Sequence, residues 1–156
     1  MHPVGSGIEQ PVTRPAAPQP PPLAGTRDMD PLPRASLNGI NVLVVEDSWH
    51  VASAIKSVIE NAGMEVVALA ATVADAEEMA ALHQPEMAVV DINLGGEDAY
   101  DFLETLFARK IPVVIISGYE VLPAATAHAA AILKKPIRAS ILLATLQRVA
   151  AARGKH

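Results

Sequence analysis

The stretch VVDINLGGED, from Val89 to Asp98, contains an abrupt change in side-chain chemistry. Two β-branched apolar residues lead directly into Asp91, and the chain then passes through a Gly-Gly pair into more acid. A β-branched run favours a strand, whereas glycines favour a turn or loop. The stretch therefore predicts a buried strand that ends on a carboxylate beside a glycine-rich loop.

The composition limits the kind of protein in which this strand can lie. The chain has 156 residues, enough for one ordinary domain, and 51% of them are hydrophobic. The absence of cysteine excludes disulfides, thiolate metal sites and Cys nucleophiles, and fits a reducing cytosol. The net charge of −5 argues against broad binding of nucleic acid or anionic membrane. No apolar run approaches the roughly 20 residues of a membrane helix, and the N-terminus lacks a secretory signal. We therefore expect a cytoplasmic protein.

The first 38 residues differ in composition from the rest of the chain. They hold nine of the thirteen prolines, including the run RPAAPQPPPL, and few apolar groups to offset the entropy of ordering. The proline spacing favours extended polyproline II conformations. We expect a disordered Pro-rich tail over residues 1–38 and one folded domain over residues 39–153.

From Gly39 onward, β-branched runs alternate with segments of helical spacing. The expected strands are INVLVV (40–45), MEVVALAA (64–71), MAVV running to Asp91, PVVIIS (112–117) and AAILK (130–134). The expected helices are 49–62, 72 or 74 to 85, 98–110, a weak Ala-rich helix after Pro123, and 139–152. This alternation implies βαβ units and a parallel sheet with helices on both faces. The predicted fold class is α/β, a flavodoxin-like doubly wound five-stranded parallel sheet of order 2-1-3-4-5.

Polar side chains collect where these strands end, which is where doubly wound sheets bind their ligands. The strand ends carry Glu46-Asp47, Asp91, Ser117-Gly118 and Lys134-Lys135-Pro136. Neighbouring carboxylates repel one another and need a cation, and oxygen ligands without His or Cys suit Mg²⁺. With that charge offset, Asp91 can attack a phosphoryl group whose oxygens are compensated by Lys135 and Ser117. Gly118 leaves room for phosphate beside its own N–H.

Four segments, in this order and at these spacings, resemble the receiver domain of two-component response regulators. They are VLVVED, MAVVDINL, VVIISGY and ILKKPI, and the resemblance covers roughly residues 39–152. It implies that Asp91 is the phosphoacceptor. It also implies that Asp47 binds Mg²⁺ directly, that Glu46 acts through water, and that Asn93 offers its backbone carbonyl to the metal.

The resemblance also assigns the remaining strand ends and shows one departure. Ser117 is the switch hydroxyl, Lys135 is the phosphate-binding lysine, and Pro136 follows a cis peptide bond. Receivers often carry Tyr or Phe three residues before the lysine, but this position is Ile132 here. The stretch PVVIISGY is instead similar to a stand-alone subgroup with the motif Pro-Phe-x-Phe-Ala-Thr-Gly, and Tyr119 then takes over part of the switching role.

The expected function is that of a single-domain response regulator in a phosphorelay, with no DNA-binding or enzymatic output domain. A histidine kinase or histidine phosphotransferase would load Asp91, and the output would be binding of an unknown downstream protein or draining of phosphate from a shared kinase. We expect a monomer with no enzymatic activity beyond its own phosphoryl transfer and any autodephosphorylation.

Three alternatives remain open at this point. The first is a receiver-fold interaction module that signals without phosphate. The second is a phosphohydrolase with an aspartate nucleophile, a class that generally shows Asp-x-Asp after the first strand. The third is a flavodoxin, for which the segment EDSWH (46–50) would repel the flavin phosphate.

Overall fold

A parallel five-stranded sheet is the centre of the structure, a computed structural model that describes residues 37–118 and 123–153. Its strands are β1 (Asn41–Val45), β2 (Glu65–Ala70), β3 (Met87–Asp91), β6 (Val113–Ser117) and β7 (Ala131–Lys134). They are arranged in the order β2-β1-β3-β6-β7, with every neighbouring pair parallel. This order confirms the predicted doubly wound topology.

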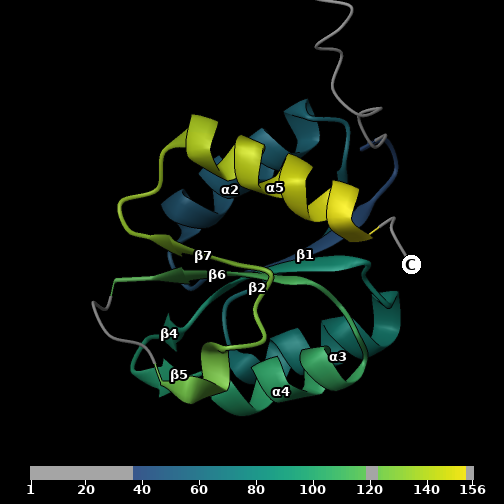
Figure 1. Cartoon of the computed structure of the whole chain (residues 1–156). Coiled ribbons are helices and arrows are strands. Elements are labelled where there is room, and N and C mark those ends of the chain that lie inside the picture. Colours follow the sequence, from purple (N-terminus) through teal and green to yellow (C-terminus); the bar gives the residue numbers. More distant parts are fainter. Residues whose placement is uncertain (1–36, 119–122, 154–156) are drawn as a thin grey trace, which may run out of the picture. The chain divides into compact units, whose positions relative to one another are not determined.

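Four helices cover the two faces of the sheet. They are α2 (Trp49–Asn61), α3 (Val73–His83), α4 (Tyr100–Ala108) and α5 (Ala139–Arg153). Figure 1 shows α2 and α5 on one face and α3 and α4 on the other. Side-chain caps define where the first two begin, because Ser48 Oγ accepts from Val51 N at 3.3 Å and Thr72 Oγ1 accepts from Asp75 N at 3.1 Å.

The central strand β3 is buried on both faces, which explains its unbroken apolar sequence. Successive side chains of a strand point to opposite faces. Val89 therefore belongs to the apolar cluster beneath α2 and α5, and Val90 to the cluster beneath α3 and α4. Phe102 is fully buried in the second cluster. The burial of β3 places Asp91, its last residue, at the centre of one end of the sheet.

Two segments differ from the sequence prediction. The helix expected after Pro123 is reduced to one 3-10 turn, Ala124–Thr126, in which Thr126 Oγ1 donates to Pro123 O at 2.8 Å. The alanines of this segment offer little apolar area, so a longer helix would bury little surface. A short hairpin of β4 (Asn93–Leu94) and β5 (Glu97–Asp98) also follows β3. Its two loop residues are glycines with φ of 62° and 91°, a conformation that a tight two-residue hairpin loop demands.

The start of the folded domain is held at the other end of the sheet. Leu37 packs against the apolar cluster beneath α2 and α5, and Gly39 N donates to Gly63 O at 3.1 Å. The rest of the expected tail, residues 1–36, lies outside the described residues. Within the part of the chain that the structure describes, each helix is too short or too polar to cross a membrane.

We expect Phe102→Ala to lower the free energy of unfolding by about 3–5 kcal/mol, because it removes a fully buried ring and leaves a cavity. Urea denaturation would measure this loss. The control is Leu82→Ala, whose side chain is 67% exposed and should change stability by no more than about 0.5 kcal/mol. Equal losses in the two variants would contradict the assignment of the core.

Candidate functional site

Three carboxylates meet at the carboxyl ends of β1 and β3. Glu46, Asp47 and Asp91 each offer an oxygen, and these oxygens lie within 4.8 Å of one another. Glu46 and Asp91 are 4% and 2% exposed, whereas Asp47 is exposed. The pairing of β1 with β3 brings them together, because the strands are adjacent, parallel and in register up to Val45 and Val90.

Lys135 approaches this cluster from the loop after β7. Its Nζ donates to Asp91 Oδ2 at 2.9 Å and lies 3.8 Å from Glu46 Oε1. Its backbone N donates to Ser117 O at 2.8 Å, and the following peptide bond to Pro136 is cis. Burial lowers the pKa of Lys135, but the hydrogen bond and charge of Asp91, with the charges of Glu46 and Asp47, outweigh it and raise the pKa. Lys135 therefore stays protonated as the counter-charge of the cluster.

Glu46 has one satisfied oxygen and one that is not satisfied. Its Oε2 accepts from Ser48 N at 3.0 Å, while Oε1 is buried and has no hydrogen-bond partner among the described residues. Burial raises the pKa of Glu46 to about 7, against the hydrogen bond from Ser48, and the charge of Asp91 raises it further. An unsatisfied buried oxygen beside two more carboxylates calls for a cation, and an all-oxygen donor set suits a hard divalent ion.

The other predicted site residues surround Asp91. Ser117 is 1% exposed and ends β6, the strand next to β3. Asn93 N donates to Asp91 Oδ1 at 3.1 Å, and Asn93 Oδ1 accepts from Gly96 N at 2.8 Å. A Cβ built on Gly118 would meet no heavy atom of the described residues within 4 Å beyond its chain neighbours. Tyr119 lies outside the described residues. The structure thus brings Glu46, Asp47, Asp91, Asn93, Ser117 and Lys135 to one end of the sheet.

Two features near these residues are absent from the expectations drawn from the sequence. One is the β4–β5 hairpin. Its residue Glu97 accepts a hydrogen bond at Oε1 from Val73 N, at the start of α3, at 3.4 Å. The other is an apolar groove of about 640 Å³ between α2 and α5, which Lys135 also lines. The Gly-Gly pair signals a tight turn and could have indicated the hairpin. The groove depends on how two distant helices pack, which no local pattern encodes.

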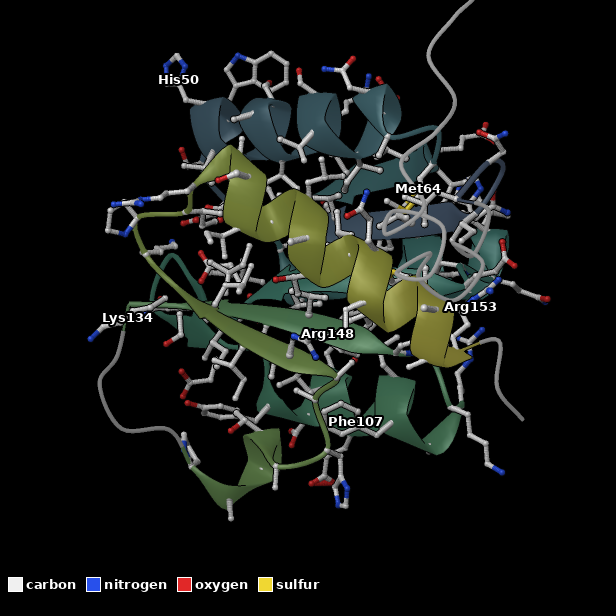
Figure 2. All side chains as sticks on the ribbon, turned by 45° about the horizontal axis from the view of Figure 1, so that its top comes forward. His50, Met64, Phe107, Lys134, Arg148 and Arg153 are labelled. Atoms are coloured by element: carbon white, nitrogen blue, oxygen red, sulfur yellow. The ribbon has the colours of Figure 1, made fainter. Side chains whose placement is uncertain are left out.

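The apolar groove opens beside the acidic cluster. Its walls are residues of α2 and of the segment that enters α5: His50, Val51, Ala54, Ile55, Val58, Pro136, Ile137, Ala139 and Leu142. Figure 2 shows His50, at the start of α2, toward the same end as Lys134, which is the last residue of β7. Because Lys135 belongs to both the groove and the acidic cluster, a molecule in this groove would lie close to Asp91.

The sequence profile of the response regulator receiver domain matches residues 42–147. The chain is similar to a protein-glutamate methylesterase/protein-glutamine glutaminase of Photorhabdus laumondii subsp. laumondii, with 36% identity over 84 residues, or 53% of this chain and 24% of the relative. It is also similar to the transcriptional regulatory protein PdtaR of Mycobacterium tuberculosis, with 27% identity over 111 residues, or 68% of this chain and 54% of the relative. The chain therefore spans about a quarter of the first relative and about half of the second.

Solved structures show the same fold. The receiver domain of the PhyR response regulator of Erythrobacter litoralis has a TM-score of 0.69 and 23% identity, covering 76% of this chain and 95% of that one. A CheY-like receiver domain protein of Methanospirillum hungatei has a TM-score of 0.68 and 22% identity, covering 76% of this chain and 98% of that one. At these identities the likeness shows the fold alone.

We expect Glu46→Gln to reduce the pH dependence of stability when a chelator keeps the protein free of metal. The pKa of Glu46 in the folded state is about 7, above its ordinary value, so the stabilisation present in acid is lost as the pH rises through about 7. Gln carries no charge at either pH. From about pH 5 to about pH 8, the free energy of unfolding of the wild type should therefore fall relative to the variant by roughly 1–3 kcal/mol.

Urea denaturation at both pH values would measure this difference. The control is Glu104→Gln, which removes an exposed carboxylate on α4. This variant should differ from the wild type in free energy of unfolding by the same amount at both pH values. A difference between wild type and Glu46→Gln that does not change with pH would show that Glu46 titrates like an exposed carboxylate.

Proposed function

The chain belongs to the response regulator receiver domain family, and from this premise we propose that it carries a phosphoryl group on Asp91 in phosphorelay signalling. The donor would be the phosphohistidine of a histidine kinase or histidine phosphotransferase, and the reaction would take place in the cytoplasm. One observation carries the proposal: Asp91 lies in contact with Lys135, within a cluster of three carboxylate side chains. The methylesterase named for the Photorhabdus relative is not proposed, because the chain covers 24% of that protein.

The acidic cluster would hold Mg²⁺. Asp47 and Asp91 would be direct ligands, Glu46 would act through water, and the backbone carbonyl of Asn93 would complete the protein's contribution. The unsatisfied Glu46 Oε1 supports this assignment, because a cation in the cluster would compensate this buried oxygen, which has no hydrogen bond from the described residues. When bound, Mg²⁺ offsets the negative charge that otherwise keeps a phosphoryl group away from Asp91.

The residues of the chain would carry out the transfer itself. A carboxylate oxygen of Asp91 attacks phosphorus, an O–P bond forms, and the P–N bond to the donor imidazole breaks with its electron pair returning to nitrogen. The Lys135 ammonium donates to Asp91 Oδ2 in this structure and would instead donate to a phosphoryl oxygen. The Ser117 hydroxyl would donate to another phosphoryl oxygen. The product is an acyl phosphate on Asp91.

The apolar groove beside Lys135 would receive the donor protein. It lies between α2 and α5, adjoins the cluster through Lys135, and is lined mainly by apolar side chains. A helix that carries phosphohistidine could bury an apolar stripe there and present the phosphoryl group to Asp91, as amphipathic helices do in other grooves. The groove supports a protein donor over a small molecule alone.

The output would come from the surface formed by β7, α5 and the turn Ala124–Thr126. The expected helix after Pro123 is a single turn here, and Ile132 and Ile141 are 46% and 49% exposed. Inward movement of Ser117 and Lys135 toward the phosphoryl group would shift a conformational equilibrium at this surface. A downstream protein would bind the shifted state, or the chain would act as a sink for phosphate from a shared kinase.

We expect Asp91→Asn to abolish phosphorylation, because the amide cannot act as the nucleophile. The wild type would be incubated with radiolabelled acetyl phosphate and MgCl₂, and retained label would be measured after gel filtration. A chelator should abolish labelling of the wild type. The matched control is Asp101→Asn on α4, which removes an exposed carboxylate outside the cluster and should label normally.

Two outcomes would overturn this proposal. If Asp91→Asn retains the label, the acceptor lies elsewhere. If the wild type takes no label from acetyl phosphate or from phosphorylated histidine phosphotransferases, the chain is a receiver-fold interaction module that signals without phosphate.

We expect Ala54→Glu to slow phosphoryl transfer from a donor protein without changing the reactivity of Asp91 toward acetyl phosphate. Ala54 is an exposed residue of α2 that lines the apolar groove, so a charge there should slow transfer from a phosphohistidine donor by at least about tenfold. Labelling by acetyl phosphate needs no docking and should be unchanged. The control is Ala144→Glu on α5, an exposed helical position that does not line the groove. Equal transfer rates for the two variants would remove the groove from the proposal.

A further inference from the structure

A second groove lies at the end of the sheet opposite Asp91. Its volume is about 970 Å³, and its lining includes Pro85 and Pro112, which precede β3 and β6, and residues from the C-terminal ends of α4 and α5. We call it the basic groove, because Arg109, Lys110, Arg148 and Arg153 all line it, together with His128. Figure 2 shows Arg148 and Arg153 on α5, with Phe107 below Arg148.

The basic groove keeps a positive charge although the chain as a whole carries −5. Among the described residues that line it, Glu86 is the one acidic side chain. Glu86 is already occupied, because its Oε2 lies 2.6 Å from Arg153 Nη2 and its Oε1 accepts from Asn41 N at 3.0 Å. These contacts lower the pKa of Glu86, first the backbone hydrogen bond and then Arg153. The charges of Arg109, Lys110 and Arg148 are left uncompensated by any acid in the groove.

Helix ends explain only some of these cations. Basic residues are favourable near a helix C-terminus, where the backbone carries partial negative charge. Arg153 ends α5, and Arg109 and Lys110 directly follow α4. Arg148 lies more than one turn before the end of α5, is exposed, and has no ion pair within the described ranges. A helix-end role therefore does not account for Arg148.

The floor of the basic groove is apolar. Val149 and Ile111 are 3% and 8% exposed, and Phe107 is half-buried with its ring edge-to-face to His128 at 5.8 Å between centroids. A small inorganic anion would leave most of this volume unfilled. Binding of a nucleic acid requires basic side chains in a row that follows its phosphate backbone, whereas this groove has an apolar floor. A polypeptide that alternates acidic and apolar side chains matches both the rim and the floor.

We propose that the basic groove binds an acidic, partly apolar peptide segment of another protein. The acidic side chains of the segment would pair with Arg148, Lys110 and Arg109, and its apolar side chains would contact Phe107 and Val149. No lining residue of the basic groove belongs to the acidic cluster at Asp91. The proposed contacts therefore do not involve Asp91 itself, and this proposal stands independently of the proposed function.

Selection from a random peptide library tests the proposal, because the sequence of the partner need not be specified. A phage-displayed library of random dodecapeptides would be panned on the full chain, with the double variant Lys110→Glu/Arg148→Glu as counter-selection. The enriched peptides are expected to combine Asp or Glu with Leu, Ile or Phe. Fluorescence anisotropy of a labelled enriched peptide should show at least about tenfold weaker binding to the double variant.

Three controls make the result decisive. Lys56→Glu reverses an α2 cation that lies outside the groove, and should bind the peptide like the wild type. Thermal unfolding of the double variant should match that of the wild type, since Lys110 and Arg148 are exposed. Amide chemical shifts on titration with the peptide should move around Phe107 and Val149 and not around Asp91.

The proposal fails on any of four results. These are peptides without acidic residues, peptides that bind the double variant as tightly as the wild type, shift changes confined to the Asp91 end, and displacement of the peptide by inorganic phosphate or a single-stranded oligonucleotide at equal concentration.

Discussion

Repulsion among three carboxylates at one end of the sheet is the constraint on which the site depends. Two of them, Glu46 and Asp91, are almost completely buried, where water cannot screen them. Lys135 offsets part of this charge through a 2.9 Å contact with Asp91. Its ammonium lies beyond hydrogen-bond distance of Glu46 Oε1, so the compensation is incomplete. The cluster therefore keeps excess negative charge, which a bound divalent cation can neutralise.

The parallel topology imposes this arrangement and also separates opposite charges. All five strands run in one direction, so their carboxyl ends share one rim and their amino ends share the other. The helices run back, which places helix N-termini near the acidic cluster and helix C-termini near the basic groove. Their partial charges favour anions at the first end and cations at the second. A sheet of mixed direction would bring neither cluster together.

The region from the end of β6 to β7 differs from what the sequence predicts and contains an exposed aliphatic side chain. Where a further helix was expected, the described residues contain one 3-10 turn built from alanines and a threonine. The next strand then leaves Ile132 exposed on the sheet edge, at the position where the family resemblance in the sequence predicts an aromatic ring. A small aliphatic side chain cannot move between buried and exposed positions with the same consequence as a ring. In the proposed phosphorelay, the switching role would therefore fall to Ser117 and Lys135, together with Tyr119, which lies outside the described residues.

The strands, their order and the residues at their ends follow from the amino-acid sequence alone. The runs ending at Val45, Val90 and Ile116 are rich in β-branched residues, and parallel topology then brings Asp47, Asp91 and Ser117 to one rim, whatever the details of packing. What each side chain contacts there depends on the packing of the whole domain. The unsatisfied Glu46 Oε1, the contact of Lys135 with Asp91, and the two grooves depend on distances between segments far apart in the chain. Local patterns encode periodicity and turns, but those distances follow from how whole helices pack on the sheet.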